Sequence, residues 1–291
     1  MADYQIFTDA TADLSPEMLS GLPPVEMIPM EVEIGGRVYT YGPSGTITPA
    51  EFYRLQREGH FSSTSQITPQ TYRQYFEPVL QDGRDILYLC FSSGLSGTFQ
   101  SAELAINELR TLYPERSIAC IDTLAASIGE GLLVCEALKR QAEGCSLSGL
   151  ASWVRENRLK VCHWFTVDTF DHLRHGGRVS AAAAVMGTAL QIKPLLHVDE
   201  EGRLKVAEKP RGHKKALHSQ IRQVTTGWEP EGFCRRIVVA HGDNPEGAKN
   251  LMGALAIHIP KAEFSTSEIG PVIGSHTGPG MLAVTYIGTN R

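Results

Sequence analysis

The sequence lacks the features that mark a membrane, secreted or nucleic-acid-binding protein. It contains no apolar run near the roughly 18 residues of a membrane span, and its acidic start predicts no signal peptide. The six cysteines are scattered without a C-x-x-C pair, which indicates reduced thiols and a cytoplasmic location. A net charge of -5 over 291 residues argues against nucleic acid as a partner. The basic segment Lys209–Lys215 is interpreted as a solvated loop and helix start.

Motifs for nucleotides and metals are also missing. Neither G-x-x-x-x-G-K-S/T nor G-x-G-x-x-G occurs. His172 and His175 lie three residues apart, but no third ligand is spaced to join them, so we expect no metal and no other cofactor. The composition, 42% apolar and 20% charged, is that of a globular protein with one large or two ordinary domains.

The clearest pattern lies between residues 85 and 113. Residues 86–91 form an almost uninterrupted apolar run, typical of a strand buried in a parallel sheet. Apolar residues then recur at three- and four-residue steps, which predicts a helix that begins near residues 96–98. These apolar residues are Phe99, Ala102, Ile106, Leu109 and Tyr113.

The turn between this strand and this helix is rich in glycine and hydroxyl groups. Ser93 and Ser96 supply hydroxyl donors, and the helix supplies free N–H groups and the positive end of its dipole. Together these groups favour binding of an anion. The alternative is that Ser96 or Thr98 only caps the helix. Because a cap needs one hydroxyl and the turn offers four, the anion interpretation is favoured.

Two other polar segments follow the same logic. Asp9 ends a strand at residues 4–7, where open α/β sheets bind ligands, and its alternative role is to cap the next turn. Residues 61–69 form a second hydroxyl-rich turn, which ordinary capping also explains.

Strands and helices alternate through the first half of the chain, which predicts right-handed crossovers and a parallel sheet. We expect an N-terminal α/β domain over residues 1–158 and a C-terminal α+β domain over residues 159–291. Strands are expected at residues 4–7, 25–34, 37–40, 86–91, 117–121, 161–167, 195–198, 204–207, 237–240 and 282–287. Helices are expected to begin near residues 16, 49, 69, 98, 122–123, 146–148, 180 and 245.

Several short motifs stand in a distinctive order and spacing. They are Thr8-Asp9, Thr64-Ser65-Gln66, Ser92–Thr98, Gly176-Gly177-Arg178, Ile192-Lys193-Pro194 and Ile269–Gly280. Over essentially the whole chain, this set resembles the DegV family of bacterial fatty-acid-binding proteins. The resemblance implies two α/β-type domains with one long-chain fatty acid, such as palmitate, buried between them.

The resemblance also implies which residues bind the ligand. The carboxylate would be held by Thr64 and Ser96, with His276 close by. Secondary candidates are Ser65, Ser93 and Gly97. Several family members hand the acid to a fatty acid kinase that makes an acyl phosphate, so a kinase is the implied partner. Arg178 would contact that partner or a phosphate; its alternative role is a salt bridge between the domains.

The chain departs from the family pattern at a few positions. Ala10 stands where Ser is common, Ile67 where Pro is common, and His175 where Lys is common, and the loop at residues 42–46 lacks an expected acidic residue. The first two departures touch the edge of the carboxylate site. The others are expected on the outer face, so they weaken the implied partnership with a kinase more than the implied ligand.

Physical chemistry is compatible with a lipid ligand. Burying a chain of about 16 carbons contributes roughly 0.8 kcal/mol per methylene, so the tail alone can supply the affinity. The head group then needs only neutral donors, to which partial protonation of His276 would add charge. We therefore expect a carrier and no enzyme.

The alternative is a serine-dependent lipid ester hydrolase with Ser96, His276 and Asp243 as its triad. The spacing disfavours it, because a nucleophile elbow needs G-x-S-x-G and Thr98 stands where the second glycine should be.

Overall fold

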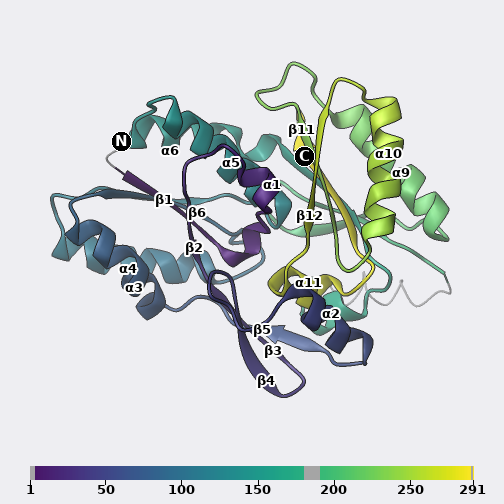
Figure 1. Cartoon of the computed structure of the whole chain (residues 1–291), viewed down its shortest axis with the longest axis horizontal. Helices are drawn as coiled ribbons and strands as arrows, with labels where there is room; N and C mark the ends of the chain where they lie inside the picture. The colour runs from purple at the N-terminus through teal and green to yellow at the C-terminus, as the bar shows by residue number, and fades with distance from the viewer. Residues whose placement is uncertain (1–3, 180–190, 290) are drawn as a thin grey trace.

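A parallel sheet organises the first half of the molecule (Figure 1). The computed structural model describes residues 4–179, 191–289 and 291. Strands pair in parallel in the order β2-β1-β6-β7, which confirms the predicted sheet. They are β1 (Tyr4–Asp9), β2 (Glu26–Ile28), β6 (Asp85–Cys90) and β7 (Ile118–Asp122). Because the strand order reverses at β1 and β6, their carboxyl ends mark the place where such sheets bind ligands.

Helices cover both faces of this sheet. Alternate residues of β6 point to opposite sides, so Tyr88 packs with α3 (Pro69–Gln81) and α4 (Thr98–Leu112) while Leu89 packs with α5 (Ile128–Ala142) and α6 (Leu147–Asn157). The predicted helix starts are confirmed for α1 (Pro16–Leu19), α2 (Pro49–Arg57), α3 and α6, each of which has a capping side chain. The capping side chains are those of Ser15, Thr48, Thr68 and Ser146.

A small antiparallel sheet projects from this domain with the order β4-β3-β5. β3 (Met30–Ile34) and β4 (Arg37–Tyr41) form the predicted hairpin through Gly35 and Gly36, whose φ angles of 60° and 73° suit glycine. β5 (Ser62–Thr64) pairs with β3. The first part of the second hydroxyl-rich turn is therefore a strand.

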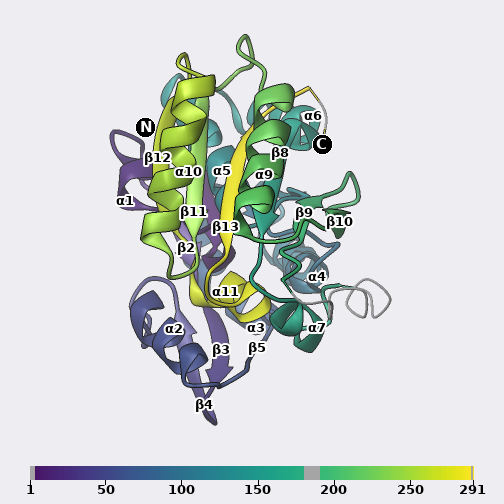
Figure 2. The ribbon, with the colours of Figure 1, turned by 90° about the vertical axis from the view of Figure 1, so that its right-hand side faces the viewer.

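The second half of the chain forms a mixed sheet with the order β10-β9-β8-β13-β11-β12. Its strands are β8 (Val161–Thr166), β9 (Leu195–Val198), β10 (Leu204–Glu208), β11 (Arg236–His241), β12 (Glu263–Glu268) and β13 (Leu282–Ile287). Helices α9 (His213–Gly227) and α10 (Pro245–His258) lie side by side on its outer face (Figure 2). The predicted hairpin of residues 195–207 and the helix start within Lys209–Lys215 are confirmed.

Helix α5 lies between the parallel sheet and the mixed sheet. Residues 128–138 are all buried, because one side of the helix packs on the first sheet and the other on β8 and β13. A mainly apolar helix is suited to this place, and its buried Glu130 accepts hydrogen bonds from Thr8 and Thr11. The predicted domain division falls at the turn η2 (Arg158–Lys160), between α6 and β8. As a domain boundary it stays a prediction.

The predicted start of α5 at residues 122–123 is wrong. Asp122 Oδ1 instead accepts hydrogen bonds from the N–H groups of Ser93 and Leu124, and Thr123 Oγ1 donates to the Cys90 carbonyl. Leu124 and Ser127 have positive φ angles of 50° and 53°. These side-chain bonds compete with helix formation, so α5 begins only at Ile128.

Four elements lie in segments where no helix or strand was predicted. They are the short helices η1 (Ala10–Ala12) and α7 (Asp171–His175), and the pair formed by β12 and α11 (Pro271–Thr277). β12 is an edge strand of polar sequence, and α11 has only seven residues, so neither has a clear apolar period. The start predicted for a helix at residue 180 falls within residues 180–190, which lie outside the described part of the chain.

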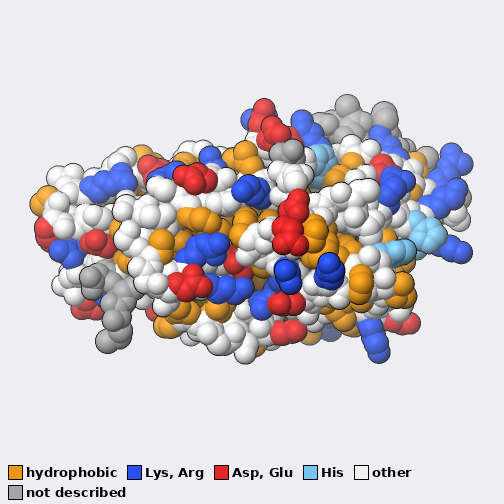
Figure 3. Space-filling model, turned by 90° about the horizontal axis from the view of Figure 1, so that it is seen from above, with side chains coloured by type: hydrophobic (Ala, Val, Ile, Leu, Met, Phe, Trp, Pro, Cys, Tyr) orange, Lys and Arg blue, Asp and Glu red, His pale blue; other side chains and the backbone are white. Residues whose placement is uncertain are grey.

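The described surface is of mixed charge. Acidic and basic side chains are interspersed over most of the face seen in Figure 3. Within residues 4–179, 191–289 and 291, no helix has both the length and the apolar character needed to cross a bilayer.

The close packing of α5 against the mixed sheet gives a test of the fold. A Cβ on Gly129 would lie 1.9 Å from His163 Nε2, so Gly129→Ala must displace a buried ring. We expect a loss of about 1–3 kcal/mol in the free energy of unfolding, measured in urea. The matched control is Gly253→Ala on the exposed face of α10, where no atom lies within 4 Å and a gain of up to about 1 kcal/mol is expected. Equal effects of the two substitutions would contradict this packing.

Candidate functional site

An apolar cavity lies between the parallel sheet and the mixed sheet. It holds about 730 Å³ of space not filled by atoms, part of it open to solvent. Its lining comes from β3, β5, the loop after β6, the start of α5, the inner face of the mixed sheet and α11. The apolar lining residues include Met30, Phe91, Leu95, Ile128, Phe165, Val198, Leu204, Val272, Ile273, Met281 and Ala283. A cavity of this kind suits a ligand that is mainly hydrocarbon.

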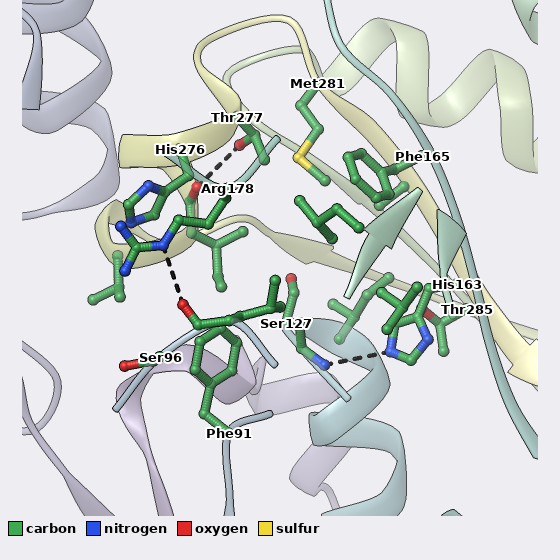
Figure 4. Close-up of a pocket in the computed structure, with 18 of the residues that line it drawn as sticks. Phe91, Ser96, Ser127, His163, Phe165, Arg178, His276, Thr277, Met281 and Thr285 are labelled. Atoms are coloured by element: carbon green, nitrogen blue, oxygen red, sulfur yellow. Dashed lines mark hydrogen bonds between the residues drawn. The ribbon is translucent and has the colours of Figure 1, made fainter. Parts of the chain in front are cut away.

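One end of the cavity is polar and is lined by four predicted residues, of which Figure 4 labels Ser96, Arg178 and His276. These residues are Thr64, Ser96, Arg178 and His276. Thr64 Oγ1 and His276 Nε2 are 3.0 Å apart and share a hydrogen bond. The Arg178 side chain lies beside the His276 ring and donates from Nε to the Leu95 carbonyl at 3.1 Å.

Thr64 and His276 are positioned by the small antiparallel sheet. Thr64 is the last residue of β5 and pairs with Val32 of β3, while α11, which carries His276, packs on β3 and β5. Glycine makes the close approach possible, because a Cβ on Gly176 would lie 2.1 Å from His276 Nδ1. Gly176 therefore leaves the space that the His276 ring occupies.

The loop that carries Ser96 is held in place by Asp9. The Asp9 carboxylate accepts hydrogen bonds from Phe91 N at 3.2 Å and Tyr88 Oη at 2.9 Å, and it caps η1 through Thr11 N. Burial raises the pKa of Asp9, and these hydrogen bonds oppose that shift. Asp9 is absent from the cavity lining, so of its two predicted roles the capping role is the one observed.

Ser96 makes local hydrogen bonds and also lines the cavity, and its predicted binding of an anion stays a prediction. Its Oγ accepts a hydrogen bond from Thr98 N at 3.2 Å and lies 2.8 Å from Thr98 Oγ1, while the N-cap of α4 is Gly97. Ser96 also lines the cavity at the N-terminus of α4. A ligand oxygen at this end would meet the Ser96 hydroxyl and the positive end of the helix dipole.

The secondary candidates do not line the cavity. Ser65 is exposed, the N–H of Ser93 is bound to Asp122, and Gly97 packs against the side chain of Gln66. Of the departures from the family pattern, Ala10 and Ile67 are buried in the core behind the site, and His175 is exposed and stacks on Phe61 at 4.8 Å.

The expectation that His276 is partly protonated is wrong. Burial and the nearby Arg178, His175 and His172 side chains lower the pKa of His276 to about 3. The ring is therefore neutral at physiological pH and acts only through hydrogen bonds.

Arg178 is the one Asp, Glu, Lys or Arg among the described residues of the cavity lining. The interdomain salt bridge considered for it is wrong, because within the described ranges it donates only to carbonyl oxygens, those of Leu95 and Gly176. Burial lowers the pKa of Arg178 but leaves it a cation. The polar end thus holds a half-buried positive charge with no carboxylate partner in the described structure.

The geometry contradicts the hydrolase alternative. His276 is bound to Thr64 and Ser96 is bound to Thr98, so no hydrogen bond links serine and histidine. Asp243 is exposed and paired with Arg57. In the part of the chain that the structure describes, no group of three or more His, Cys, Asp or Glu side chains could hold a metal ion.

The residues that line the apolar part of the cavity were not predicted from the sequence. Their side chains obey the same periodic patterns as ordinary core residues, so no local signal separates the two classes. Two polar lining residues, Ser127 and His163, were missed as well. Ser127 lies before α5, whose start was placed too early.

Together the fold and the site define an α/β protein with an apolar cavity between two sheets and a polar end on that cavity. A family model described as "Uncharacterised protein, DegV family" matches residues 3–289. A DegV domain-containing protein of Clostridium perfringens is 39% identical over 100% of this chain and 99% of its own. The chain belongs to the DegV family.

Solved structures give the same result. A Thermus thermophilus DegV family protein, described by its fatty acid binding, is 34% identical with a TM-score of 0.84, covering 98% of this chain and 99% of its own. A fatty acid binding DegV family protein of Streptococcus agalactiae is 28% identical with a TM-score of 0.85 over 100% of both chains. The Streptococcus pneumoniae fatty acid kinase B3 protein, loaded with linoleic acid, shares the fold at 22% identity with a TM-score of 0.86, covering 99% of each chain.

The lowered pKa of His276 predicts how stability depends on pH. The folded state takes up this proton only near pH 3, whereas an unfolded histidine takes it up near 6.5, so protonation favours unfolding between these values. As the pH falls below 6.5, the free energy of unfolding should decrease more steeply in the wild type than in His276→Gln, by up to about 1.4 kcal/mol per pH unit. Urea unfolding at a series of pH values measures this, and parallel curves would show that His276 titrates normally.

Proposed function

We propose that this protein binds one long-chain fatty acid of the palmitate type, with the carboxylate at the polar end and the tail in the apolar cavity. The observation that carries the proposal is the Arg178 cation, which has no carboxylate partner among the described residues and lies at the end of a cavity whose other lining is mainly apolar. A carboxylate supplies the missing charge, and a hydrocarbon chain fits the remaining lining.

The groups at the polar end are donors of the kind that a carboxylate accepts from. The hydroxyls of Thr64 and Ser96 can donate to it, and the neutral His276 ring orients Thr64 at 3.0 Å. Arg178 adds a charge-assisted donor without a competing acid. Relatives at 34% and 28% identity that bind fatty acids support the same assignment.

Affinity would come mostly from the tail. Each buried methylene contributes about 0.8 kcal/mol before the costs of association, so a chain of about 16 carbons exceeds what tight binding requires. The polar end would then select ligands that carry a carboxylate and orient them in the cavity.

Removing the two hydroxyls tests this assignment. We expect the purified protein to release a fatty acid on extraction, detected by mass spectrometry, and to rebind palmitate. Thr64→Val combined with Ser96→Ala should weaken palmitate binding about tenfold or more, since two hydrogen bonds to a charged group are lost. Titration calorimetry measures the change.

The matched control removes two nearby hydroxyls that lie outside the cavity. Ser65→Ala combined with Ser93→Ala should leave the palmitate affinity within about twofold. If the wild type is empty and refuses palmitate, the proposed function is wrong. If both double variants bind like the wild type, the carboxylate lies elsewhere.

We further propose that the bound acid is presented to a fatty acid kinase, which makes the acyl phosphate. The described residues offer no nucleotide motif and no activated nucleophile, so the chemistry must come from a partner. Arg178 lies at the polar end, where it can contact the carboxylate and later the phosphate.

A charge-neutral variant separates these roles of Arg178. Arg178→Met should weaken palmitate binding about tenfold and spare hexadecanol, because the alcohol has no charge for the guanidinium to meet. At saturating palmitate, acyl phosphate formation by an added fatty acid kinase should also fall, measured by hydroxylamine trapping. Equal losses for the acid and the alcohol would mean that Arg178 only supports the fold.

A further inference from the structure

A second polar pair lies in the same cavity, away from the carboxylate site. His163 of β8 and Thr285 of β13 are direct cross-strand partners on the inner face of the mixed sheet, and both line the cavity. Figure 4 places them on the opposite side of the cavity from Arg178 and His276. The neighbouring cross-strand pair, Phe165 and Ala283, is apolar. Side chains of directly opposed residues on one face lie about 5 Å apart, so the two polar groups form one small patch.

Part of the hydrogen-bonding capacity of this patch is unused. His163 Nε2 accepts from Ala126 N at 3.4 Å, so the proton of the neutral ring is on Nδ1, which lies near the Val161 carbonyl but makes no hydrogen bond of good geometry with a described residue. Burial holds the pKa of His163 well below its ordinary value, which keeps the ring neutral. Thr285 lines the cavity, and no hydrogen bond links its Oγ1 to another described residue. His163 is 6% exposed and Thr285 1% exposed, so neither group is satisfied by bulk water.

Other hydroxyls of the cavity lining are satisfied, whereas at the polar end His276 Nδ1 is a buried nitrogen without a partner among the described residues. Thr277 Oγ1 donates to the Ile273 carbonyl at 3.1 Å within its own helix, and Ser127 Oγ donates to Asp13 Oδ2 at 2.5 Å. Buried polar groups almost always have partners, so two adjacent groups without one, facing a ligand cavity, call for an explanation. A hydrocarbon tail would leave both unpaired.

We propose that the cavity selects fatty acids that carry a hydroxyl group on the acyl chain, recognised by His163 and Thr285. This inference rests on the proposed function and specifies its ligand. A hydroxyl oxygen can accept from His163 Nδ1–H while its proton is donated to Thr285 Oγ1, so one group satisfies both residues. A keto oxygen has no proton to donate. It could only accept hydrogen bonds, from His163 Nδ1–H and from the Thr285 hydroxyl.

The position of the pair indicates where on the chain the hydroxyl lies. β13 begins at Leu282, shortly after the helix that carries His276, and Thr285 is three residues farther along the strand. At about 3.3 Å per residue, this places the patch roughly 10 Å along β13. Because the pair also lies across the cavity from Arg178 and His276, the matching carbon is one away from the carboxylate.

The test compares hexadecanoic acid with hydroxyhexadecanoic acids that carry the hydroxyl at a mid-chain or at the terminal carbon. In the wild type, at least one hydroxy acid should bind about fivefold or more tightly than the unsubstituted acid, since a site built to bond a hydroxyl disfavours the analogue without it. In Thr285→Val, which keeps the β-branched shape, the ratio of the affinity for the hydroxy acid to that for the unsubstituted acid should fall toward one. Titration calorimetry gives both affinities.

Two further variants keep the test independent of folding. Thr285→Ser retains the hydroxyl and should retain the preference. Thr277→Val makes the same substitution in the same cavity at a hydroxyl that is already satisfied, and should also leave the preference unchanged.

The outcomes separate this inference from the function on which it rests. Binding of hexadecanoic acid with no preference for any hydroxy acid, or a preference that survives Thr285→Val, overturns the inference and leaves the proposed function intact. Failure of the wild type to bind any of the acids overturns both.

Discussion

The hydrogen bond between Thr64 and His276, 3.0 Å long, closes the polar end of the cavity and joins residues 212 positions apart in the chain. The pairing of β5 with β3 holds one partner, and the packing of α11 on the same small sheet holds the other. Because burial keeps the imidazole neutral, the bond needs no counterion. The Arg178 charge is therefore left for a ligand.

Helices and strands could be predicted from the sequence wherever a short local pattern was sufficient to specify them. The apolar run of β6 and the Ser-Pro or Thr-Pro starts of α1, α2 and α3 each specify their element without help from distant residues. The prediction was wrong at the start of α5, where Asp122 and Thr123 bond to the neighbouring serine loop. β12 and α11 are stabilised by packing against the rest of the fold, and their short sequences carry no period of their own.

The candidate site could be predicted only in part for the same reason. The hydroxyls of the serine loop were visible as a local excess, whereas Thr64 and His276 came from the resemblance to a family. The protonation state of His276 depends on burial by the segment that holds His172, His175 and Arg178, and no local pattern reports that burial. The residues expected to surround the tail cannot be told from core residues in the sequence, because both sets are apolar and buried.

Affinity and selectivity have different physical sources in such a cavity. Apolar burial scales with chain length and is nearly indifferent to which chain is bound, so it gives strength with little discrimination. Discrimination needs buried polar groups, because leaving one of them unpaired costs more than its bond contributes. A lining that was wholly apolar beyond the carboxylate would accept any acid of suitable length. The His163–Thr285 pair is a polar interruption in this apolar lining, at one cross-strand position of the mixed sheet. The hydroxyl of Thr277 could not have the same effect, because it is already bonded to the Ile273 carbonyl.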